Sequence, residues 1–129
     1  MKALIEAGYV GKVLTCHLAT LRQVPLKRPS HMTWLGDVTN GATTLTIKSG
    51  HVIDALRFVA GDFARLGSMV TSQVKQWYET DTKKMVDVTA PDNVLLNGQL
   101  VSGAAASVHV ATIPWAPSGY RMEIYGTEG

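Results

Sequence analysis

The chain contains stretches in which apolar and polar residues alternate and one stretch in which apolar residues recur every three or four positions. Alternation predicts strands, because successive side chains of a strand point to opposite faces. We expect strands at 13–21, 45–48, 94–101, 104–112 and 120–125, and a longer extended run at 66–77. Residues 51–60 instead follow a period of 3.6 and predict a helix, with Val52, Leu56, Val59 and Ala60 on one stripe.

Residues that start and stop elements support these assignments. Ser49 stands where the N-cap of the helix would be, and Gly61 follows its last periodic residue as a C-terminal stop. Ser102-Gly103 between two alternating runs fits a tight hairpin. Residues 2–7 are strong helix formers that resemble the end of a longer helix.

The resulting order is strand, strand, helix, and then at least four strands joined by short turns. Consecutive strands with hairpin links favour an α+β fold, an open and largely antiparallel β-sheet with helix packed on one face. A length of 129 residues predicts a single domain, 1–129.

Composition excludes several classes of protein. A net charge of +2 and the absence of long charge runs argue against nucleic acid as a partner. No apolar run reaches the length of a membrane span, and no signal-peptide pattern is present. The one cysteine, Cys16, cannot form an internal disulfide, which fits a cytoplasmic protein, and its place in a strand predicts a buried, inert thiol.

The chain carries few signs of catalytic machinery of its own. No nucleophile motif is present, and the four histidines are too scattered for a metal site. Gly8 and Gly11 bracket a turn but lack the G-x-G-x-x-G pattern of a dinucleotide-binding loop. We therefore expect no catalytic, cofactor or metal site within the isolated chain.

His51 is the leading candidate for a ligand-binding side chain. It is predicted in the first turn of the helix, off the apolar stripe and on the same face as Asp54. The positive end of the helix dipole would favour the neutral imidazole, which exchanges hydrogen bonds with hydroxyl groups. The alternative is a structural role, in which His51 caps the turn or bonds Asp54.

Two further features suit contact with a small molecule. The proline-rich loop 22–30 carries Arg22, Lys27 and Arg28, which could reach an anionic group or simply be solvated. Trp34, beside glycine-containing turns, could stack on a sugar ring or serve as a core anchor.

Three blocks of the sequence resemble a known family. They are Ala7–Val13, the strand-turn-helix stretch with G-H-x-x-D-x-L-x-x-x-x-G from Gly50 to Gly61, and the ending from Tyr120 to Gly129. In this order they are similar to the C-terminal domain of the Gfo/Idh/MocA oxidoreductases, NAD(P)-dependent dehydrogenases of sugars, inositols and related polyols. The family usually has a D-x-G-x-H arrangement, where this chain has Ile47 for the Asp and Ser49 for the Gly. The Gal80-like subgroup also lacks that Asp and matches better.

The resemblance implies a substrate-side and oligomerisation domain that belongs to a longer protein. It implies that NAD or NADP, and a catalytic lysine, reside on a preceding nucleotide-binding domain that this chain does not contain. His51 would face the sugar or polyol, Lys48 would add a donor or a charge, Trp34 would contact the substrate and Asp54 would support His51. The alternatives are a Gal80-like regulator without turnover and a plain dimerisation module.

The strand patterns also predict assembly. The runs 66–77, 94–101 and 104–112 place apolar residues on both faces, whereas a solvated face should alternate more cleanly. An exposed apolar face is rare in monomers, and burying it against a second copy gives a two-fold interface. The resembled family assembles through this face. We therefore expect a homodimer, or a larger homo-oligomer, formed sheet to sheet.

Overall fold

A computed structural model describes all residues, 1–129. Its main sheet has five strands in the order β3-β6-β7-β1-β8. Three of the four neighbouring pairs are antiparallel, and β1 with β7 is parallel. The predicted α+β class with an open, largely antiparallel sheet is confirmed. The bounds are β1 (Val13–Gln23), β3 (Phe63–Thr71), β6 (Asn93–Leu100), β7 (Ala105–Ile113) and β8 (Gly119–Gly126).

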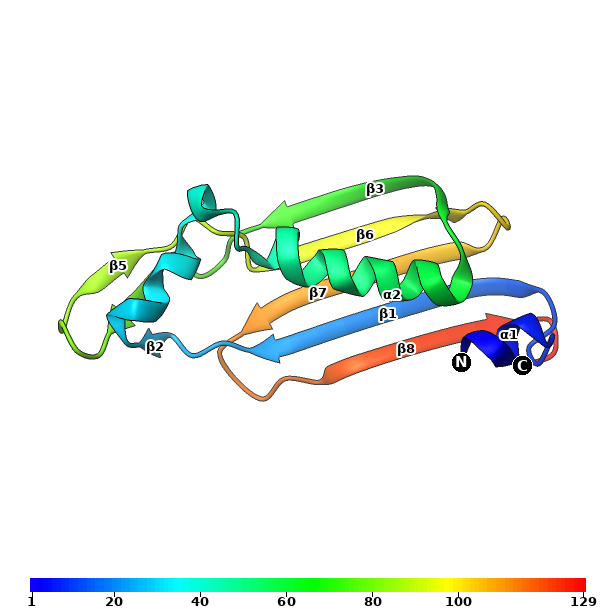
Figure 1. Cartoon of the computed structure of the whole chain (residues 1–129), viewed down its shortest axis with the longest axis horizontal. Coiled ribbons are helices and arrows are strands. Elements are labelled where there is room, and N and C mark those ends of the chain that lie inside the picture. The colour runs from blue at the N-terminus through cyan, green and yellow to red at the C-terminus, as the bar shows by residue number, and fades with distance from the viewer.

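One helix, α2 (Gly50–Ala60), lies along one face of this sheet (Figure 1). Its Leu56 is fully buried and Val52 nearly so, as the stripe predicts. They pack in one cluster with alternate residues of the central strands, because those side chains point to the same face of the sheet. The cluster contains Cys16, Leu18, Val52, Leu56, Val94, Leu96, Leu100, Ala104, Ala106, Val108 and Val110.

The stretch before this helix differs from the prediction. Residues 45–48 are not a strand but part of η3 (Thr44–Ser49), a π-helical segment that runs directly into α2. Thr43 caps it: its hydroxyl accepts from the Thr46 backbone N–H, while the Thr46 hydroxyl accepts from the Thr43 N–H. Four alternating residues cannot separate a strand from an amphipathic helix when a cap favours the helix.

The predicted cap of α2 is also wrong. Ser49 has helical backbone angles and makes no capping bond. Its hydroxyl donates 2.9 Å to the Thr44 carbonyl and is fully buried. Gly61 does end the helix with a positive φ of 96°, and its N–H donates to the Arg57 carbonyl.

A second, smaller sheet lies beyond the ends of β1 and β7 (Figure 1). It consists of β2 (Lys27–Arg28), β4 (Gln76–Glu79) and β5 (Met85–Asp87), with β2 parallel to β4. The predicted extended run 66–77 is therefore two strands, since β3 ends at Thr71 and β4 begins at Gln76. Two short 3-10 segments, η1 (Ser30–Gly36) and η2 (Val38–Asn40), connect this region to η3.

The remaining elements follow the sequence patterns. The short helix α1 (Lys2–Glu6) lies near the C-terminus of the chain (Figure 1). Strands β6 and β7 form the expected hairpin, with Gly103 at a φ of 91° in the turn. None of the helices is both long and apolar enough to cross a bilayer.

Candidate functional site

A cavity of about 450 Å³ lies where the main sheet meets the small sheet. The parallel strands β1 and β7 both end here, because parallel strands carry their carboxyl ends to the same edge. Its wall combines the segment after β1, the π-helical η3, the strand β4 and the loop before β6. The volume lies within the range of small-molecule sites, roughly 300–1,000 Å³.

Three basic residues line the cavity, and two of them, Arg28 and Lys48, are partly buried. Lys48 reaches it from η3, and its ammonium group has no hydrogen-bond or ion-pair partner in the structure. Burial lowers the pKa of Lys48, and the positive charges of Arg22 and Arg28 lower it further. Basic residues outnumber acidic ones in the wall, which contains Asp92 as its one acidic residue.

Arg28 is the second cation, and it is held in place by two contacts. Its guanidinium lies 3.5 Å from the centre of the Trp77 ring. Its Nε and Nη2 donate to the Pro25 carbonyl at 3.3 and 2.9 Å. Burial lowers the pKa of Arg28. The guanidinium has five N–H donors, so several remain available to a ligand.

The only acidic residue in the wall is occupied by the protein itself. The buried Asp92 carboxylate accepts from the backbone N–H groups of Gln73 and Val74 at 2.9 and 2.7 Å. It also accepts from the Asn93 side-chain amide at 2.8 Å. Asp92 thus fixes the loop that forms the wall, and no acidic residue forms an ion pair with Lys48.

The structure places the other predicted residues outside the cavity wall. Trp34, His51 and Asp54 are all exposed, and His51 makes no hydrogen bond to Asp54. Ile47 does belong to the wall, and His51 follows it by four residues, so the two lie about one helical turn apart. The site residues proposed from the sequence are therefore split, with Lys48 in the wall and His51 on the adjacent helical surface.

His51 lies further from the start of the helix than the sequence predicts. The helical segment begins at Thr44, six residues before α2, so His51 is not at a free helix N-terminus. The helix dipole is effective only within the first turn of the whole helical segment, which does not include His51. An exposed histidine off the apolar stripe remains available to a ligand or a neighbouring domain.

Two important wall residues, Trp77 and Asp92, were not predicted as site residues. Each contacts a segment far from it in sequence: Trp77 meets Arg28, and Asp92 meets Val74. The only sequence signal for this part of the wall is the cluster of basic residues in loop 22–30. That cluster predicts either contact with an anionic group or a solvated loop. Periodicity reveals faces of elements but not which distant segments meet.

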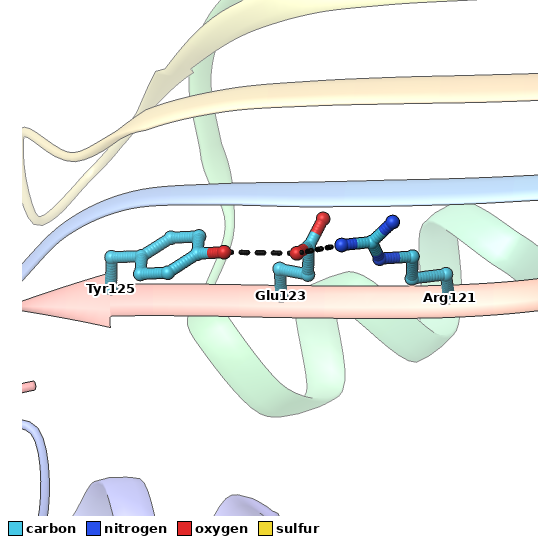
Figure 2. Close-up of polar contacts among 3 residues, drawn as sticks. All are labelled: Arg121, Glu123 and Tyr125. Carbon is cyan, nitrogen blue, oxygen red and sulfur yellow. Dashed lines mark hydrogen bonds and ion pairs between the residues drawn. The ribbon is translucent and has the colours of Figure 1, made fainter.

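The face of the main sheet opposite α2 carries a polar row. Met122 and Ile124 pack against the core, so Arg121, Glu123 and Tyr125 of β8 point to the open face. Figure 2 shows them in line, with Glu123 accepting from the Tyr125 hydroxyl at 2.9 Å and from Arg121 at 2.6 Å. The hydrogen bond from Tyr125, followed by that from Arg121, lowers the pKa of Glu123.

This open face is mixed rather than purely apolar. His17 and Ser107 exchange a 2.7 Å hydrogen bond on neighbouring strands, and Leu95 and Met69 lie on the same face. Nowhere does the structure gather three or more His, Cys, Asp or Glu side chains into a metal-binding group.

Comparison with known proteins identifies one matching family, and the relatives include a dehydrogenase and a regulatory protein. The family model described as Gal80p, C-terminal domain, matches residues 1–129. The dehydrogenase aclE of Aspergillus oryzae is 27% identical over 135 residues, which cover 100% of this chain and 37% of the relative. The galactose/lactose metabolism regulatory protein GAL80 of Kluyveromyces lactis is 25% identical over 143 residues, covering 99% of this chain and 31% of the relative.

Solved structures have the same fold. Levoglucosan dehydrogenase in complex with NADH and L-sorbose superposes with a TM-score of 0.80 at 22% identity, covering 98% of this chain and 34% of that one. The chain thus spans about a third of the length of the proteins it matches.

Proposed function

The chain belongs to the family of Gal80p C-terminal-like domains, and from this we propose that it is the substrate-side and oligomerisation domain of a longer NAD(P)-dependent oxidoreductase. The substrate would be a sugar, an inositol or a related polyol. Dehydrogenase relatives of the same fold, one of them in complex with NADH and L-sorbose, support this choice. The domain would bind the substrate and contribute to assembly but would not catalyse the reaction in isolation.

The observation that carries the proposal is the cavity beside η3. It is of small-molecule size and combines apolar walls with a few polar groups, as ligand sites do. Ile47 and Lys48 line it, and His51 lies about one turn further along the helix. A substrate held between this surface and a nucleotide-binding domain could contact His51 and the cavity wall together.

Each proposed site residue has a distinct role. The imidazole of His51 would exchange a hydrogen bond or a proton with a substrate hydroxyl, for which its two ring nitrogens are suited. Lys48 would donate to the substrate from the cavity wall, and exposed Trp34 would offer an aromatic face to a sugar ring. Asp54, on the face of His51, would orient the imidazole.

NAD or NADP would bind to the preceding domain, and it would supply the hydride acceptor. The residues of this chain would therefore act on the substrate only. Residues 1–129 would form a single C-terminal domain of a cytoplasmic protein.

A regulator without turnover is the second candidate, and Ile47 favours it. An isoleucine occupies the position at which the resembled oxidoreductases carry an Asp, and it is 48% exposed at the cavity. A carboxylate there could pair with the imidazole of His51, whereas Ile47 cannot. The Kluyveromyces lactis relative is named as a regulatory protein.

The test is an assay of the longest natural protein that contains these residues. Formation of reduced nicotinamide is followed with NAD and with NADP over a panel of sugars, inositols and polyols that includes sugar acids and sugar phosphates. Turnover on any of them supports the oxidoreductase. Tight dinucleotide binding without turnover on the whole panel would instead identify the regulator.

A further inference from the structure

The charges around the cavity do not balance. Its wall contains three basic side chains, Lys27, Arg28 and Lys48, and one acidic side chain, Asp92. The carboxylate of Asp92 is already occupied by backbone and amide N–H groups. The ion pairs of the structure are Lys2 with Glu6, Arg57 with Asp62 and Arg121 with Glu123, none of them at the cavity.

The two inner cations are arranged to act together. Lys48 and Arg28 come from different elements, η3 and β2, and line the same cavity. The Trp77 ring and the Pro25 carbonyl fix the Arg28 guanidinium, which limits the entropy lost when a ligand binds. Burial lowers the pKa of Lys48 most, and the positive charges of Arg22 and Arg28 lower it further, as expected when like charges lie near one another.

Unpaired charges in a partly buried wall are unfavourable, because water solvates them incompletely. An anion would relieve both the desolvation and the mutual repulsion. Arg suits carboxylates and phosphates in particular, since its planar fork of donors matches their oxygen atoms.

We propose that the cavity binds the anionic group of a sugar-sized ligand, a carboxylate or a phosphate, between Lys48 and Arg28. This inference rests on the proposed function. It narrows the substrate class from sugars and polyols in general to sugar acids or sugar phosphates. The apolar part of the wall would contact the carbon skeleton of the ligand, which the volume of about 450 Å³ accommodates.

The experiment is isothermal titration calorimetry on the longest natural protein that contains these residues, without dinucleotide, with three sugar-sized probes. D-gluconate supplies a carboxylate, D-glucose 6-phosphate supplies a phosphate, and D-glucose is the neutral reference. We expect at least one of the two anions to bind about tenfold or more tightly than D-glucose, with an affinity that falls as salt concentration rises. The two anionic probes distinguish a carboxylate ligand from a phosphate ligand.

Three variants locate the effect. Lys48→Met should weaken binding of the preferred anion by about tenfold or more, and Lys48→Arg should retain most of it. Lys84→Met is the matched control, because Lys84 is exposed in the turn at the far end of the small sheet and is absent from the cavity wall. Circular dichroism and the melting temperature establish that each variant is folded, and Lys48→Arg reports on the charge if Lys48→Met unfolds.

Three results would overturn the proposal: equal affinity for D-glucose and both anions, no binding of either anion, or the same loss in Lys48→Met and Lys84→Met. These failures differ from failure of the proposed function. If the longer protein oxidises neutral sugars or polyols while the anions do not bind, the oxidoreductase proposal stands and the anionic substrate is wrong.

Discussion

The Asp92 carboxylate accepts a hydrogen bond of 2.7 Å from the backbone N–H of Val74, a residue 18 positions earlier in the chain. Asp92 directly precedes β6 of the main sheet, and Val74 lies between β3 and β4, where the chain passes to the small sheet. Both residues line the cavity. This contact therefore joins the two sheets and fixes one wall of the candidate site.

Replacing Asp92 should destabilise the fold. Asp92→Ala leaves the N–H groups of Gln73 and Val74 without their acceptor, and hydrogen bonds to charged groups contribute about 1.5–3 kcal/mol each. We expect the free energy of unfolding to fall by about 3 kcal/mol or more in urea denaturation. Asp54→Asn is the control, since Asp54 is exposed and has no hydrogen-bond partner. Equal stability of both variants would contradict the role of Asp92.

Replacing His51 should affect activity rather than stability. In the longer protein, His51→Ala should lower turnover by roughly 10²-fold or more, as expected for a lost acid–base group. The melting temperature should change little, because His51 is exposed and makes no hydrogen bond within the chain. Normal kinetics combined with a clearly lower melting temperature would indicate a structural histidine instead.

The isolated chain should not bind NAD or NADP tightly. Pyrophosphate recognition usually depends on a glycine-rich turn between a strand and a helix, and the chain has no G-x-G-x-x-G motif. Calorimetry with each dinucleotide measures this directly, and the longer protein serves as the positive control. Micromolar binding to the isolated chain would place the cofactor in this domain and contradict the proposed division of roles.

The open face of the main sheet should form a homodimer interface. Leu95 lies on this face, because its neighbours Val94 and Leu96 point into the core. The substitution Leu95→Arg places a positive charge on this face. It should weaken dimerisation, because desolvating an unpaired guanidinium at the interface is unfavourable. Sedimentation equilibrium at micromolar concentrations would show a dimer for the native chain and a shift toward monomer for the variant. Val101→Arg, at an exposed hairpin residue, should leave the dimer intact. A native chain that remains monomeric at every concentration would refute this assembly.

Cys16 should be unreactive in the folded chain. The thiol is 1% exposed, and burial raises its pKa, so the thiolate that reacts with disulfide reagents is disfavoured at neutral pH. We expect labelling by a thiol-specific disulfide reagent to be about 10²-fold slower or more than in urea-unfolded chain, because reaction then requires opening of the core. Rapid labelling under native conditions would mean that β1 is exposed or detached.

Local sequence patterns determined the main helix and most strands of the main sheet. The stripe of Val52 and Leu56 identified the face of α2 that is buried, and alternation identified β1, β6, β7 and β8. These signals are reliable because they arise from repeated contacts with one core. Residues 45–48 show where alternation fails as a predictor. Four alternating residues predict a strand there, but the capping interaction at Thr43 favours the helical segment η3.

The tertiary structure alone decided which distant segments meet. The parallel pairing of β1 with β7 joins residues about 90 positions apart, such as Cys16 and Ala106, and brings two strand ends to one edge. The contact of Arg28 with Trp77 and that of Asp92 with Val74 then close the cavity at this edge. No periodicity encodes such contacts, because they depend on how whole elements pack against a shared core rather than on the spacing of neighbours in the chain. For this reason the sequence indicated Lys48 and the basic loop separately, whereas only the folded chain places them around one cavity.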